Sequence, residues 1–196
     1  MLGRNKQLLN AILTALFAAI IYIGISVLRI PLPAIVGRPF IHFGNPLMVI
    51  AILFLGGVWG GVAAAVGLGG FDILNGYAAT SWLTVLEVIV MAIVVSAIMR
   101  AFKHDDRPSH IITIGIAAGI TKLITSFLVT VVEGLMAGMT LKPAIIASFL
   151  SLTAPAINAV ASAIIVPILY FLLRRAFQAA RRQETPPSCQ PPTADS

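Results

Sequence analysis

The chain has 196 residues, of which 59% are hydrophobic and 10% are charged, and its mean hydropathy is +1.00. A soluble domain carries roughly 25% charged residues, so lipid must surround most of this surface. The net charge of +6 does not indicate nucleic-acid binding, because the basic residues cluster at the ends of apolar runs. The only cysteine, Cys189, lies in the polar C-terminal segment, which excludes a disulfide framework and a cysteine-based metal site.

The N-terminal segment has the charged start of a signal peptide, with Arg4 and Lys6 before an apolar run. That run, residues 8–28, is longer than the apolar core of a signal peptide, and no small-residue cleavage site follows it. We therefore expect an uncleaved first transmembrane span.

Apolar runs separated by proline, glycine and polar residues predict an all-α integral membrane protein, a bundle of six transmembrane helices. Glycines crowd the third run and permit close packing or a bend, and Asn75-Gly76 predicts the turn after it. Pro155 and Pro167 should bend or divide the last run. The expected spans are 8–28, 45–56, 58–73, 82–99, 110–135 and 144–173.

The basic residues predict the orientation of this bundle. With the N-terminus inside, nine Lys and Arg residues lie on inner segments and three on outer ones, as the positive-inside rule requires. Both termini are therefore expected in the cytoplasm. Residues 1–175 should form one transmembrane, substrate-binding domain, and residues 176–196 a polar cytoplasmic tail without fixed structure.

Ionisable and amide side chains inside a bilayer are costly, so each is a candidate functional residue. Lys122 lies near the middle of the fifth span, whereas the others lie in the outer halves of the spans. This pattern predicts a pocket open to the outside, because a conducting pore is polar along its whole length. The candidate substrate-binding residues are His42, Asn45, Asp72, Asn75, Glu87, Lys122, Glu133 and Asn158.

Each charged candidate also has a structural interpretation. Lys122 either contacts an anionic ligand or forms a buried ion pair with Glu87 or Glu133. Asp72 either contacts the ligand or binds backbone donors of the following turn. Glu133 either contacts the ligand or is an interfacial residue.

Each uncharged candidate likewise has either a structural role or a role in ligand binding. Asn45 precedes a proline, which fits an N-cap of the second span, and His42 beside it can cap or reach a ligand. Asn158 forms either an interhelical hydrogen bond or a ligand contact. Tyr77 and Trp82 belong to the aromatic belt or stack on an aromatic ligand.

Small residues recur every four positions on the first span, at Ala11, Ala15 and Ala19. They form one stripe of the helix, which suits either close contact with a partner helix or packing within the bundle. No HExxH, GxSxG or GxxxxGK[ST] motif is present. We therefore expect no enzymatic activity, and no hydrolysis of ATP by this chain.

Several stretches resemble the substrate-binding (S) components of energy-coupling factor (ECF) transporters, in the branch for riboflavin, pantothenate, hydroxymethylpyrimidine and pyridoxine. They are Ala11-x-x-x-Ala15, the proline-rich loop after the first span, residues 40–46 (FIHFGNP), and residues 55–61 (LGGVWGG) leading to 71–76 (FDILNG).

The resemblance implies a six-helix protein of the cell membrane that captures a vitamin near its outer face. Ala11, Ala15 and Ala19 would dock on a transmembrane coupling protein that sits on two ABC-type ATPases, which hydrolyse the ATP. The loop with Pro33, Arg38 and Phe40 would be a gate over the pocket. No cofactor is implied in this chain.

The residues indicate the family more specifically than they indicate the substrate. Lys122 favours an anionic vitamin such as pantothenate, unless it pairs with Glu87. The acidic residues suit hydroxymethylpyrimidine or pyridoxine, and riboflavin is a further candidate. The alternative function is a self-sufficient, ion-coupled transporter of a small polar solute, which would act without ATP.

Overall fold

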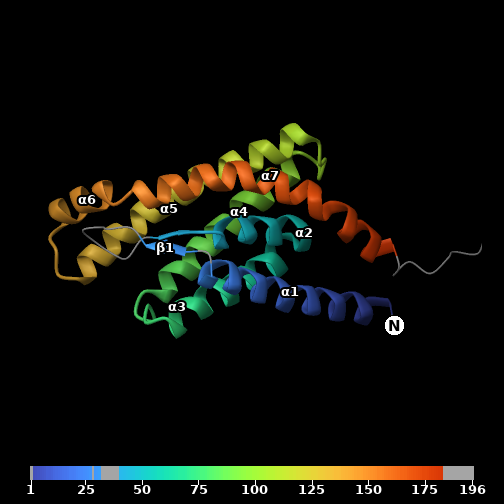
Figure 1. Cartoon of the computed structure of the whole chain (residues 1–196), viewed down its shortest axis with the longest axis horizontal. Coiled ribbons are helices and arrows are strands. Elements are labelled where there is room, and N and C mark those ends of the chain that lie inside the picture. The colour runs from blue at the N-terminus through green and yellow to red at the C-terminus, as the bar shows by residue number, and fades with distance from the viewer. Residues whose placement is uncertain (1, 28, 32–39, 183–196) are drawn as a thin grey trace, which may run out of the picture.

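Long apolar helices run side by side along one axis of the molecule (Figure 1). The computed structural model describes residues 2–27, 29–31 and 40–182. Its elements are α1 (Leu2–Val27), β1 (Arg29–Pro31), β2 (Phe40–His42), α2 (Gly44–Ala64), the π-helix η1 (Ala65–Gly69), α3 (Gly70–Leu74), α4 (Ser81–Ala101), α5 (Pro108–Met136), α6 (Leu141–Leu150) and α7 (Thr153–Arg182).

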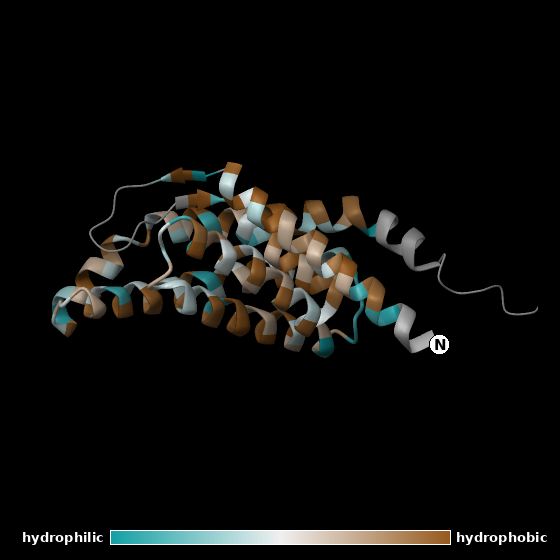
Figure 2. Cartoon of the chain, turned by 90° about the horizontal axis from the view of Figure 1, so that it is seen from below, coloured by the Kyte–Doolittle hydropathy of each residue, from teal (hydrophilic) through white to brown (hydrophobic). Residues whose placement is uncertain are grey.

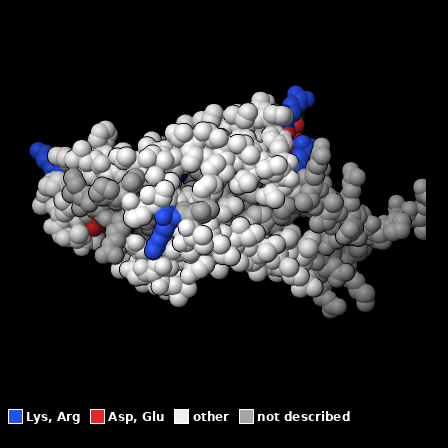
Figure 3. Space-filling view, in the orientation of Figure 1, with Lys and Arg blue, Asp and Glu red and all other residues white. Residues whose placement is uncertain are grey.

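The described part of the chain contains five helices long and apolar enough to cross a membrane, and α6 is a shorter apolar helix. Apolar residues cover most of the outward faces of these helices (Figure 2). The face seen in Figure 3 is nearly free of charged side chains along most of its length. These observations confirm an all-α membrane protein.

One of the five candidate spans, Gly44–Leu74, contains a reversal at Gly56, where the backbone leaves the helical region at φ 82° and ψ 170°. A Cβ added at Gly60 would lie 2.4 Å from the Cα of Ile52. Residues eight apart in a straight helix are about 12 Å apart, so the two limbs of this segment fold back on each other. The boundary predicted between the second and third spans is this reversal.

The reversal makes the chain traverse the bundle six times in its described part: in α1, the two limbs of 44–74, α4, α5 and α7. The start of α1 and the end of α7 consequently lie at the same end of the bundle (Figure 1). The first limb, Gly44–Leu55, is about 18 Å long, which is shorter than a hydrocarbon layer of about 30 Å.

The last predicted span differs from the structure at both ends. The chain breaks at Ser151-Leu152, so that α6 and α7 are separate helices. Pro155 falls in the first turn of α7, where its missing N–H costs nothing, and Pro167 lies inside that helix. α7 also continues to Arg182, so residues 176–182 are helical where a tail without fixed structure was predicted.

The proline-rich connection after α1 begins and ends in a short antiparallel ribbon. β1 pairs with β2 in the register Arg29 to His42, Ile30 to Ile41 and Pro31 to Phe40. Pro33 and Arg38 of the predicted gate lie outside the described residues, and Phe40 is described here only by its backbone pairing. The gate therefore stays a prediction.

The opposite end of the bundle is held by polar contacts from the turn between α4 and α5. Asp106 binds Arg174 of α7 at 2.8 Å, and Asp105 binds Arg107 at 3.0 Å. A cavity of about 150 Å³, the far cavity, lies beside the Gly56 reversal at this end, and Ile52, Leu53, Gly56, Gly57, Ser96, Met99, Arg100 and His104 line it.

Substitution of Gly60 tests the reversal. We expect Gly60→Ala to lower the free energy of unfolding by about 1–3 kcal/mol, because the new methyl group would overlap the Ile52 backbone. In a straight helix the same change would stabilise by up to about 1 kcal/mol. Thermal unfolding in detergent measures the difference, and Gly70→Ala is the control, because no atom lies within 4 Å of a Cβ there.

Candidate functional site

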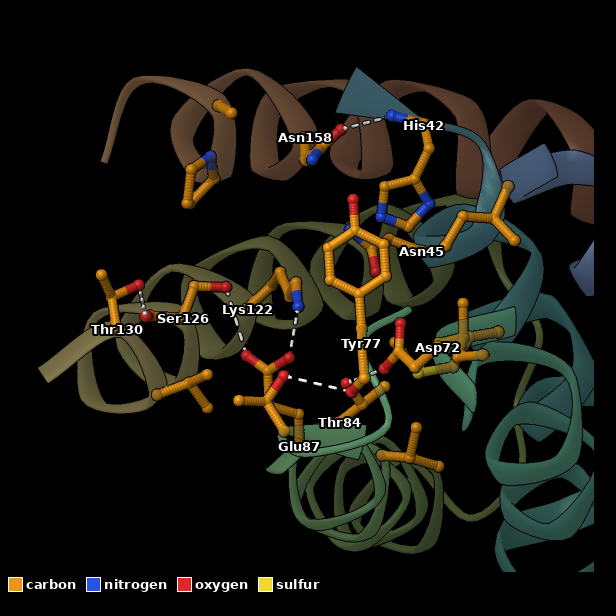
Figure 4. Close-up of a pocket in the computed structure, with 18 of the residues that line it drawn as sticks. His42, Asn45, Asp72, Tyr77, Thr84, Glu87, Lys122, Ser126, Thr130 and Asn158 are labelled. Atoms are coloured by element: carbon orange, nitrogen blue, oxygen red, sulfur yellow. Dashed lines mark hydrogen bonds and ion pairs between the residues drawn. The ribbon is translucent and has the colours of Figure 1, made fainter. Parts of the chain in front are cut away.

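A polar cavity of about 160 Å³ opens among the helices at the end of the bundle that carries the ribbon. Seven of the eight predicted substrate-binding residues line it, and they come from β2, α2, α3, α4, α5 and α7 (Figure 4). The full lining is Ile25, His42, Asn45, Met48, Leu68, Asp72, Tyr77, Thr80, Thr84, Glu87, Val88, Lys122, Ser126, Val129, Thr130, Glu133, Ala154, Pro155 and Asn158.

Two opposite charges of this polar cavity form an ion pair between α4 and α5. Lys122 Nζ donates to Glu87 Oε2 at 2.6 Å, and Ser126 Oγ donates to Glu87 Oε1 at 3.2 Å. The side chains of Lys122 and Glu87 are 15% and 13% exposed. The pairing with Glu87 removes the reason for preferring an anionic ligand such as pantothenate, because the ammonium charge is already neutralised.

In the part of the chain that the structure describes, the other two carboxyl groups in the cavity have no basic partner. Asp72 accepts a short hydrogen bond from the Thr84 hydroxyl and makes no salt bridge. Among the described residues, no Lys, Arg or His nitrogen lies within 4 Å of the Asp72 or Glu133 carboxylates. Three carboxyl groups and one lysine therefore share this wall.

His42 closes the cavity on the ribbon side. Its backbone N–H donates to Asn158 Oδ1 at 3.1 Å, and its Nδ1 accepts the Gly44 N–H at 3.0 Å. A ring nitrogen that accepts a hydrogen bond carries no proton, so the imidazole is neutral. Burial, and then the positive charge of Lys122, lower the pKa of His42 to about 3.

Asn45 lies in the first turn of α2 and is 2% exposed. The helix begins at Gly44, and Phe43 is its N-cap residue, so the prediction of Asn45 as N-cap is wrong. The Gly44 amide is satisfied instead by His42, which is the capping role proposed for that residue. The Asn45 Nδ2 group is buried without a hydrogen-bond partner.

Two predicted residues lie elsewhere. Asn75 is exposed and donates from Nδ2 to the Phe71 carbonyl at 2.9 Å, which places it in the turn with Gly76 and outside the cavity lining. Trp82 is 49% exposed and also lies outside the lining. Tyr77 does line the cavity, and its ring stacks on Phe71 with the centroids 6.4 Å apart.

Hydroxyl residues of the wall were missed by the sequence analysis. Thr80, the N-cap residue of α4, is followed at helical spacing by Thr84 and Glu87 of that helix. Lys122, Ser126 and Thr130 recur at the same spacing along α5. Residues four apart lie on one face of a helix. The hydroxyl residues could therefore have been predicted from the sequence, because they lie on the same helix faces as the charged residues.

The described residues hold no group of three or more His, Cys, Asp or Glu side chains placed to bind a metal ion. The polar cavity instead offers hydrogen-bond donors, acceptors and an aromatic ring, which together can bind a small polar organic molecule.

A family model described as "ECF-type riboflavin transporter, S component" matches residues 5–175 of the chain. Neither a curated protein nor a solved structure matches it significantly. The family match covers every residue that lines the polar cavity.

Removing one partner of the ion pair should destabilise the bundle. We expect Lys122→Met to lower the free energy of unfolding by about 3 kcal/mol, because it leaves Glu87 buried without a counter-charge. The double variant Lys122→Met, Glu87→Leu should recover most of this loss. Thermal unfolding of both in detergent provides the measurement, and equal losses in both variants would contradict the pair.

His42 predicts a stability that depends on pH. In the unfolded chain this imidazole takes up a proton near pH 6.5, whereas in the folded protein it stays neutral down to about pH 3. The stabilisation is complete above pH 6.5 and is lost as the pH falls towards 3, by roughly 1 kcal/mol per pH unit. His42→Asn, whose amide oxygen can still accept the Gly44 N–H, should flatten the slope of thermal stability between pH 6.5 and 5, and an unchanged slope would contradict the assignment.

Proposed function

Because this chain belongs to the family of S components of ECF-type riboflavin transporters, we propose that it captures a small water-soluble vitamin or vitamin precursor for import. The family is one of transporter subunits and not of enzymes. The single observation that carries the proposal is a polar cavity, lined by seven predicted binding residues, inside a bundle with a lipid-facing exterior. The candidate ligands of this proposal are riboflavin, pantothenate, hydroxymethylpyrimidine and pyridoxine.

The energy for import would come from partners, because this sequence has no phosphate-binding loop. We place the cavity end outside and both termini in the cytoplasm, in agreement with the excess of basic residues on the segments at the opposite end. The partners would be the ECF transmembrane coupling protein and two ABC-type ATPases.

The exposed face of α1 supports docking of the coupling protein there. Ala11, Ala15 and Ala19 are all exposed, whereas Phe17 and Ile21 on the other face are 3% and 0% exposed. Large apolar neighbours flank the alanines on the exposed side, including Ile12 at 56% and Leu16 at 52%. A stripe of small residues between larger ones lets a partner helix approach closely.

A bulky residue in the stripe should separate docking from ligand capture. We expect Ala15→Trp to abolish co-purification with the coupling protein while vitamin binding by the isolated subunit is retained, because Ala15 points away from the cavity. Val90→Trp, at a 40% exposed position on α4, is the matched control. Loss of association in both variants, or loss of vitamin binding in Ala15→Trp, would contradict docking through α1.

Transport in proteoliposomes tests the proposed function as a whole. Mass spectrometry of the co-purified small molecule identifies the solute, which is then used in radiolabelled form. We expect uptake only when the coupling protein, the ATPases and ATP are all present. Uptake by this chain alone, driven by an ion gradient, would favour the self-sufficient transporter instead.

A further inference from the structure

Among the described residues, the charges around the polar cavity do not balance. Its wall carries the carboxyl groups of Asp72, Glu87 and Glu133 and the ammonium group of Lys122, and Glu87 and Lys122 neutralise each other. His42 is neutral, since its Nδ1 accepts the Gly44 amide. Asp72 and Glu133 are the two acidic groups that remain.

Arg29, another basic residue at this end of the described chain, is not paired with either acid. The Arg29 guanidinium lies over the Phe71 ring, 5.4 Å from its centroid, and makes no salt bridge with Asp72 or Glu133. Thr84 donates a hydrogen bond to Asp72 but brings no charge. Two carboxylates that line a cavity among lipid-embedded helices attract a cation, because the local dielectric is lower than in bulk water.

Asn45 contributes a hydrogen-bond donor to the cavity, in contrast to the acceptors of the two acids. Its Nδ2 donor is buried and has no partner among the described residues, and a buried donor without an acceptor is costly. A ring nitrogen or hydroxyl of a bound ligand would supply that acceptor. Tyr77 extends into the cavity between Asp72 and His42 (Figure 4), and its ring offers a face for a flat ligand.

On the basis of the proposed function, we propose that this S component selects a nitrogen heteroaromatic ligand carrying a positively charged amino group. The amino group lies against Asp72 and Glu133, and an acceptor on the ring faces Asn45. Anionic vitamins are disfavoured, because they would meet two carboxylates and a lysine that is already paired.

Matched ligands isolate the charge. Pyridoxamine and pyridoxine differ in one substituent, an amine in place of a hydroxyl, and so do the 5-aminomethyl and 5-hydroxymethyl forms of 4-amino-2-methylpyrimidine. Calorimetry on the purified full chain in detergent at pH 7.5 measures all four, with riboflavin and pantothenate alongside. We expect the amine of at least one pair to bind at least about tenfold more tightly than its hydroxyl partner, the value of a charged hydrogen bond.

Variants of the acidic residues show where the amine binds. Glu133→Gln and Asp72→Asn should each reduce the affinity for the amine about tenfold or more and change that of the hydroxyl partner little. Asn45→Leu should weaken both ligands equally, since the ring acceptor is common to them. Asp105→Asn, which removes an acid at the opposite end of the bundle, should change neither.

The outcomes separate this inference from the proposed function. Equal affinities within both pairs, or tighter binding of pantothenate or riboflavin than of either amine, would overturn the charge selection and leave vitamin capture intact. An equal loss for amine and hydroxyl ligands in Glu133→Gln and in Asp72→Asn would assign those residues a structural role and overturn the inference. A folded protein that binds none of the six compounds and co-purifies with no vitamin would contradict both proposals.

Discussion

The ion pair of Lys122 with Glu87 determines how the middle of the bundle is organised. A charged side chain in a lipid-embedded helix must find a partner within the protein, and here the partner lies on the neighbouring helix at 2.6 Å. The pair therefore fixes the rotation of α4 relative to α5 and turns the hydroxyl stripes of both helices toward the same space. Because the pair neutralises Glu87, Asp72 and Glu133 are the acidic groups that remain in the cavity.

Small residues set the distances between the helices around that pair. Gly119 of α5 lies against the backbone of Ala159 on α7, so that a Cβ there would come within 2.7 Å of the Ala159 carbonyl oxygen. Gly67 lies equally close to Ala18 and Ile21 of α1. Water supplies no hydrophobic driving force between helices inside a bilayer, so close backbone packing of this kind holds them together.

The sequence predicted which segments are helical better than it predicted where the helices end and which buried charges form pairs. Hydropathy reports which segments face lipid, and it placed the long spans and the reversal near Gly56-Gly57 correctly. It could not choose between Glu87 and Glu133 as the partner of Lys122, because both lie at suitable depths and the choice depends on helix rotation. A division of the last run was predicted at Pro155 or Pro167, whereas the break lies at Ser151-Leu152. Its short polar signal lies inside a long apolar run and did not stand out.

The candidate site was predictable to a similar extent. Charged and amide residues in apolar helices are rare enough to stand out, and seven of the eight named ones line one cavity. Asn75 carries the same polarity but belongs to a turn, which composition alone does not distinguish. Threonine and serine are ordinary in transmembrane helices, so Thr84 and Ser126 needed the spacing relative to Glu87 and Lys122 to be noticed.

The short first limb of the 44–74 segment makes the barrier between the two cavities thin. Met48 lines the polar cavity and Ile52 lines the far cavity, and these residues are one helical turn, about 6 Å, apart along the same limb. The residues between them, Val49, Ile50 and Ala51, are 1%, 0% and 0% exposed. A single turn of buried apolar side chains thus separates the two cavities along this limb.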